Sequence, residues 1–139
     1  MEVREVESWD KPIPAGGNVS GEYWSAAADG RLLIQRCPSC GARQFYPRLV
    51  CAACGEEPEW EEAEGRGVVH TFTVIRQNGI KPFSEELPYV VAIIELGEGP
   101  RMMGNVTGCA PDTVTVGMPV KAYAVKIEAG LAIPLWEPA

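Results

Sequence analysis

The sequence contains a single histidine, His70, and this scarcity limits the catalytic chemistry open to the chain. A hydrolase or an acyltransferase needs a nucleophile with a base within hydrogen-bond reach, and histidine most often supplies that base. His70 lies in a stretch rich in β-branched residues, where a lone histidine is usually packed or exposed without touching a substrate. We therefore expect that the chain is not an enzyme on its own.

Phosphate-binding and carboxylate motifs are missing as well. No Gly-rich loop of the phosphate-cradling kind is present, and Gly97-Glu98-Gly99 is predicted to be a turn. Glutamates crowd residues 56–64, but a run of like charges is most simply a solvated face. The alternative interpretation of this run is a docking patch for a basic partner surface.

Long apolar runs are also absent, and basic residues are few. No apolar segment approaches the ~20 residues that span a bilayer, and no basic region followed by an apolar stretch opens the chain, so we expect a cytoplasmic protein without a membrane partner. Twelve Lys and Arg stand against 19 Asp and Glu, a formal net charge of −7, which opposes non-specific binding to nucleic acid. The 46% hydrophobic and 22% charged shares are those of a folded chain, and 139 residues suffice for one ordinary domain or for a metal module on a compact core.

Two CxxC pairs are the strongest positive signal: Cys37 and Cys40, then Cys51 and Cys54. Tetrahedral Zn²⁺ accepts four thiolates, and two facing CxxC turns complete such a cage. A glycine follows each pair and suits the tight turn. Disulfides or a redox CxxC are the alternative, but a redox motif would be single and set in a βαβ pattern. The sequence predicts a closed, structural zinc site, with Cys109 left as a small buried side chain.

The N-terminal third divides into an arm and a metal module. Residues 1–19 hold several Pro and Gly and show no period, so they are predicted to be an extended arm. Residues 20–62 are predicted to hold a helix of about ten residues with Ser20 as its N-cap, followed by the zinc ribbon. Strands over residues 31–36 and 43–48 lead into the two CxxC turns.

Residues 63–139 contain several segments rich in β-branched residues, and turn signals separate these segments. Strands are predicted at 67–75, 89–96, 101–107, 114–116, 120–127 and 131–136. Because these strands are short and no helix is long enough to be a crossover, a closed barrel of the five-stranded OB type is predicted, with a β-sandwich as the alternative. Residues 77–88 are predicted to form a long irregular loop, a place where function often lies.

Three segments together carry a resemblance to a known family: RCPSCGARQFYPRLVCAACG, GRGVVHTFTVIR and PYVVAIIELGEGPRMMGNVTG. They resemble the acyl-CoA-associated OB-fold proteins with a rubredoxin-like zinc ribbon. The resemblance extends from about residue 20 to the end, and its most specific part is the Phe45-Tyr46-Pro47-Arg48 stretch beside the ribbon.

This resemblance implies a mainly β chain in which an N-terminal helix and a Cys₄ rubredoxin-like zinc ribbon precede an OB-fold β-barrel. It also implies an accessory subunit of a thiolase-superfamily enzyme, such as a thiolase or a sterol-carrier-protein-type aldolase, or of an enoyl-CoA hydratase. A heterotetramer acting on acyl-CoA, in steroid side-chain or other acyl-CoA degradation, is the implied assembly.

Coenzyme A presents phosphates, an adenine ring and a long pantetheine arm, so its binding calls for Arg or Lys, an apolar channel and an aromatic face. Arg48 beside Phe45 and Tyr46 is one candidate patch, and Lys81 with Phe83 is another. The alternative is that the three aromatic side chains pack between ribbon and barrel. Tyr23 and Trp24 on the helix are predicted to be core or partner-facing residues.

Zinc ribbons and OB barrels also serve in nucleic-acid binding, so a single-stranded nucleic-acid-binding module is the alternative function. It requires a basic groove with exposed aromatic side chains. The acidic balance of the chain argues against it.

Overall fold

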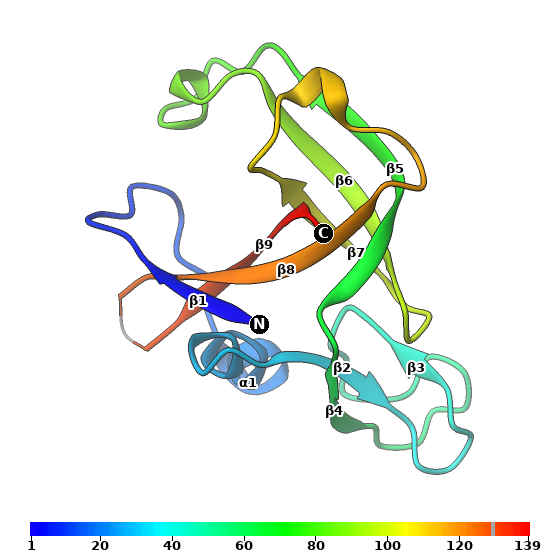
Figure 1. Ribbon diagram of the computed structural model, residues 1–139. Coiled ribbons are helices and arrows are strands. Elements are labelled where there is room, and N and C mark those ends of the chain that lie inside the picture. The colour runs from blue at the N-terminus through cyan, green and yellow to red at the C-terminus, as the bar shows by residue number, and fades with distance from the viewer. Residues whose placement is uncertain (129) are drawn as a thin grey trace.

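The computed structural model describes residues 1–128 and 130–139, and it is mainly β as expected. A large sheet curls into a barrel, and a small three-stranded sheet and a helix lie side by side below it (Figure 1). Among the described residues, no helix is both long and apolar enough to cross a membrane.

Five strands close the barrel: β5 (Arg66–Ile75), β6 (Tyr89–Leu96), β7 (Arg101–Val106), β8 (Pro119–Lys126) and β9 (Ala132–Pro138). They follow the order β8-β5-β6-β7-β9, and β9 pairs back onto β8. This ring confirms the predicted OB-type barrel and rules out the β-sandwich alternative, whose two sheets would not join.

The interior of the barrel is filled by alternate side chains of its strands. In β6 every second residue from Val90 to Leu96 is buried, as expected of a strand with one face on the core. Trp136 of β9 is almost wholly buried and lies against Gly104 of β7, where an added Cβ would stand 2.6 Å from the indole Cδ1. Glycine at this position therefore lets the indole fill the space between β7 and β9.

The first residues of the chain form a strand. β1 (Glu2–Glu5) pairs in parallel with β8 at the edge of the large sheet. The Arg4 guanidinium donates to both carboxylate oxygens of Glu137, at 2.9 and 2.8 Å, and lies 3.9 Å from the centre of the Tyr123 ring. Because these partners lie far away in the sequence, the strand could not be seen in the local pattern. Residues 6–16, here named the strap, lead from β1 to the helix as coil.

Helix α1 (Gly17–Ala28) begins three residues before the predicted cap. The prediction that Ser20 caps the helix is wrong: Gly16 is the N-cap, and the Ser20 hydroxyl donates to the Gly16 carbonyl oxygen from within the helix. Glycine is an acceptable N-cap, so the helix gains an extra turn. Ala27 packs against Ala124 of β8 and Ala132 of β9, and these small residues let the helix lie close to the barrel.

The small sheet is the body of the ribbon. β2 (Leu32–Arg36) is its central strand, between β3 (Arg43–Gln44) and β4 (Glu59–Ala63). The predicted strand over residues 43–48 thus ends at Gln44. Part of the acidic run, predicted to be a solvated face, is strand β4: Trp60 packs against the core, and Glu61 accepts hydrogen bonds from Arg43. The abundance of glutamate obscured the alternation of a strand.

Of two further predicted segments, a strand at 114–116 and an irregular loop at 77–88, only the loop is found. The strand predicted at 114–116 is wrong: a 3₁₀ turn at Pro111–Thr113 is followed by coil, and Val114 is buried in the core without a strand partner. The predicted irregular loop at 77–88 is confirmed, with a 3₁₀ turn at Phe83–Glu85.

Candidate functional site

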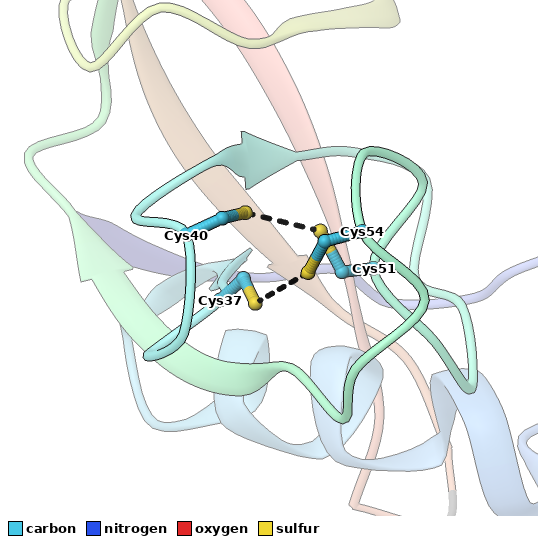
Figure 2. A group of neighbouring side chains, drawn as sticks. All are labelled: Cys37, Cys40, Cys51 and Cys54. Carbon is cyan, nitrogen blue, oxygen red and sulfur yellow. Dashed lines mark hydrogen bonds between the residues drawn. The ribbon is translucent and has the colours of Figure 1, made fainter.

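Four cysteine side chains converge at the end of the ribbon (Figure 2). All four Sγ atoms lie within 4.8 Å of one another, with Cys37 and Cys54 separated by 3.5 Å and Cys40 and Cys51 by 3.7 Å. A tetrahedron with Zn–S bonds of about 2.3 Å has edges of about 3.8 Å, whereas a disulfide needs about 2.05 Å. The four thiols therefore fit a tetrahedral zinc ion and are not disulfides.

The two CxxC turns have the same backbone geometry. The Gly41 N–H donates to the Cys37 carbonyl at 2.8 Å, and the Gly55 N–H donates to the Cys51 carbonyl at 2.9 Å. Both glycines have positive φ, 76° and 82°, which the tight turn requires. Backbone N–H groups of Cys54 and Ala53 lower the pKa of the Cys51 thiol, a direction that favours its thiolate form.

A pair of glutamines, which sequence reasoning missed, holds the chain between the two turns. Gln35 is only 5% exposed, and its amide accepts from the Arg48 N–H at 2.9 Å and donates to the Arg48 carbonyl at 3.0 Å. Gln44 donates to the Gln35 amide oxygen at 2.8 Å and accepts from the Ala52 N–H at 2.8 Å. The pair fixes the segment that presents Phe45 and Tyr46. The sequence feature that could have indicated this pair is a glutamine on each side of the first CxxC turn, Gln35 before it and Gln44 after it.

An apolar groove of about 720 Å³ opens between helix α1, the ribbon segment after β3, the irregular loop, and strands β6, β7 and β9. Its lining residues are mostly aromatic and aliphatic: Val19, Ser20, Tyr23, Trp24, Phe45, Tyr46, Pro47, Phe83, Tyr89, Val91, Met103, Gly104, Asn105, Ile133, Pro134 and Leu135. All three parts of the chain, the helix, the ribbon and the barrel, contribute to the groove.

Four aromatic rings form a continuous cluster on one wall of this groove. The centre of the Tyr23 ring lies 4.8 Å from that of Trp24 and 5.2 Å from that of Phe45, and Phe45 lies 4.7 Å from Tyr46. These spacings are those of favourable aromatic pairs. Burial, followed by the nearby Tyr46, raises the pKa of the Tyr23 hydroxyl, which therefore stays protonated.

The five side chains predicted to contact coenzyme A divide between the groove and its surroundings. Phe45, Tyr46 and Phe83 line the groove, and Tyr46 is 51% exposed. Arg48 and Lys81 are exposed and are not lining residues; the Lys81 side chain, 82% exposed, has Glu85 at 3.8 Å. Half-buried Phe45 packs against the core, as the alternative prediction held for that ring.

The other residues singled out in the sequence lie away from the groove. His70 is exposed and stands at a β-bulge of β5, between Val69 and Thr71. Cys109 is half-buried and packs against the core. Neither side chain is among those that line the groove.

Comparison with known proteins places the chain in a family. The ChsH2 rubredoxin-like zinc ribbon domain matches residues 24–61, and the ChsH2 C-terminal OB-fold domain matches residues 60–125. A DUF35 domain-containing scaffold protein of Methanocaldococcus jannaschii is 40% identical over 99 residues, which cover 70% of each chain. The chain belongs to the DUF35 family.

Other relatives include longer proteins. A probable enoyl-CoA hydratase alpha subunit of Thermomonospora curvata is 37% identical over 93% of this chain, and a 3-oxo-4,17-pregnadiene-20-carboxyl-CoA hydratase alpha subunit of Mycobacterium tuberculosis is 29% identical over 90%. The chain spans 40% and 39% of these two proteins. A chain of the solved Ltp2-ChsH2(DUF35) aldolase matches with a TM-score of 0.80 and 35% identity, over 91% of this chain and 98% of that one.

Proposed function

We propose that this DUF35 chain is a non-catalytic accessory subunit of a thiolase-superfamily enzyme, a thiolase or an aldolase, that acts on acyl-CoA thioesters. The observation that carries the proposal is the aromatic groove framed by helix, ribbon and barrel. It occurs in a chain that matches the aldolase chain over nearly its whole length. In this role the partner supplies the nucleophile and the base, and the chain forms one wall of the acyl-CoA site.

The groove has the character of a site for the apolar part of such a ligand. Small-molecule sites are concave and mostly apolar, with a few polar groups at set positions. Here Asn105 is the amide among the lining side chains, and its Nδ2 is held by a 2.9 Å hydrogen bond to the Val90 carbonyl. A wall that excludes water strengthens the partner's polar contacts to the thioester oxygen.

The phosphates of coenzyme A require cations, and no Lys or Arg is among the residues that line the groove. We assign the phosphates to the exposed Arg48, whose backbone is held by Gln35, and to Lys81 on the irregular loop. Charged hydrogen bonds from Arg or Lys to phosphate are strong and suit such a rim position. Phe45 and Tyr46 would then contact the adenine or pantetheine part, and Phe83 the acyl part of the thioester.

The ribbon also offers a surface for the partner enzyme. Leu49 is 71% exposed and Val50 is 51% exposed, and both lie on the segment between the two CxxC turns that also carries Tyr46. Apolar side chains gathered on an otherwise polar module are typical of a protein interface. The zinc cage keeps this segment rigid, and a rigid surface loses less conformational entropy on binding.

An enoyl-CoA hydratase is the second candidate partner, because two relatives are named as hydratase alpha subunits. The name of the Mycobacterium tuberculosis relative also supports a steroid acyl group as one candidate substrate. The groove disfavours single-stranded nucleic acid as the ligand, because such sites pair aromatic side chains with a basic channel.

Affinity purification of the tagged chain from its source cells tests the proposal. We expect a thiolase-fold enzyme or a hydratase to co-purify in stoichiometric amount, and its activity on an acyl-CoA to fall when the chain is removed. Full activity of that enzyme without the chain, at unchanged stability and KM, would contradict an accessory role.

Substitution separates a ligand-binding role from a purely structural one. Arg48→Ala should raise KM for the CoA thioester about tenfold, the usual effect of losing one charged hydrogen bond, without lowering the melting temperature. Arg76→Ala is the matched control, since Arg76 is also exposed and pairs with Asp112 outside the groove. An equal change in KM for both variants would show that Arg48 does not contact the CoA thioester.

A further inference from the structure

A second hollow of about 510 Å³ adjoins the groove on the side of the strap. One of its walls is the strap itself, with Trp9, Lys11 and Pro12, and the opposite wall includes Phe83 and Glu86 of the irregular loop. Figure 1 shows the strap and this loop on the same side of the barrel. Five residues line both hollows: Phe83, Tyr89, Asn105, Ile133 and Leu135.

An ion pair joins the two walls of the second hollow. The Lys11 Nζ lies 2.8 Å from Glu86 Oε1, and it also lies 4.8 Å from the centre of the Trp9 ring. The Trp9 indole N–H donates to the Pro12 carbonyl at 3.4 Å, which folds the strap back on itself. The strap is thus held against the loop by this ion pair, and its Trp9 and Pro12 side chains line the hollow.

The floor shared by the two hollows is fixed by side chains that pack on each other. The Phe83 and Tyr89 rings are 6.4 Å apart, and the Tyr89 hydroxyl accepts a 3.1 Å hydrogen bond from the Asn78 side chain. Asn78 in turn accepts from the Ile80 N–H at 3.0 Å. The loop is therefore tied down where the groove passes into the second hollow.

We propose that the second hollow binds the distal end of an elongated apolar acyl chain whose CoA-proximal part lies in the groove. This inference rests on the function proposed above and names the ligand class: acyl groups too long for the groove alone. The aromatic and aliphatic lining suits hydrocarbon. Glu86 neutralises Lys11, so the hollow does not select a second anionic group.

Binding of CoA thioesters of different length to the purified full chain tests the inference. Isothermal titration with butanoyl-CoA and with dodecanoyl-CoA, below its micellar concentration, should show at least about tenfold tighter binding of the longer thioester, since each buried methylene contributes about fourfold. Trp9→Ala removes one wall and should reduce this preference to about threefold or less, whereas Trp9→Phe should keep most of it.

Tyr46→Ala is the contrasting variant, because Tyr46 lines the groove and not the second hollow. It should weaken both thioesters alike and leave the length preference intact. Equal affinity of the wild-type chain for both thioesters would overturn the inference, whether or not the Trp9 variants fold. An unchanged length preference in a folded Trp9→Ala variant would overturn it too.

Free dodecanoate distinguishes failure of this inference from failure of the proposed function. If dodecanoate binds in a Trp9-dependent way and neither thioester binds, the second hollow is supported as an acyl site and the CoA role is refuted. If none of the three probes binds, the inference is overturned.

Discussion

Replacing Gln35 by Met should loosen the ribbon segment that carries Phe45 and Tyr46. The substitution keeps the side-chain volume but removes three hydrogen bonds, two to the Arg48 backbone and one from Gln44. Each such bond contributes about 1 kcal/mol net, and a buried group left without a partner costs more. Because Arg48 itself is exposed, water can replace part of the loss. We expect destabilisation by about 2–3 kcal/mol.

Calorimetric melting in the presence of zinc is the assay for this loss. The entropy of unfolding scales to about 0.3 kcal/mol per kelvin for 139 residues, so the melting temperature should fall by about 7–10 °C. Exchange of the Arg48 amide hydrogen should accelerate, because Gln35 is its acceptor. Gln77→Met is the matched control: Gln77 is exposed on the irregular loop, and a surface change is expected within about 0.5 kcal/mol.

Two outcomes would refute this reasoning. A melting temperature of the Gln35→Met chain within about 2 °C of wild type would show that the amide network contributes nothing net. A fall in melting temperature equal to that of Gln77→Met would show that the effect comes from introducing methionine and not from the lost hydrogen bonds.

Two further predictions concern the metal and the pH. The purified chain should contain about one zinc ion per molecule. The Cys37→Ser variant should lose the zinc and melt at a lower temperature, whereas the Cys109→Ser variant should keep it. Equal metal content in the two variants would exclude the Cys₄ site. The Arg4 hydrogen bond, offset in part by burial, holds the pKa of Glu137 below its ordinary value of 4.5. Stability from this pair is therefore complete above about pH 5 and is lost as pH falls through the lowered pKa. Denaturant titrations of wild type and Glu137→Gln should differ at pH 7, and the difference should shrink as pH falls below 4.5. A difference independent of pH would point to packing, and the exposed Glu57→Gln is the control.

Local patterns predicted the elements whose signal is local. The cysteine spacing predicted four sulfurs in one cluster, and the β-branched residues of segment 89–96 predicted strand β6. The irregular loop was predicted from Asn78-Gly79 and its prolines. In each case the residues that decide the structure are neighbours in the sequence.

Elements held by distant partners were missed or misplaced. Strand β1 depends on β8 and on the Arg4–Glu137 pair, and strand β4 depends on β2, so neither could be inferred from its own glutamate-rich composition. The strand predicted at 114–116 failed for the converse reason: Val114 is buried, but no strand of the described residues pairs with it.

The sequence by itself determined the four-cysteine centre and the β-rich barrel, because thiolate spacing and richness in β-branched residues are properties of short segments. Only the tertiary structure decided which of Phe45, Tyr46, Arg48, Lys81 and Phe83 share a groove. That groove forms where the helix, the ribbon, the irregular loop and three barrel strands meet. Its shape depends on packing between segments far apart in the chain, which no local pattern records.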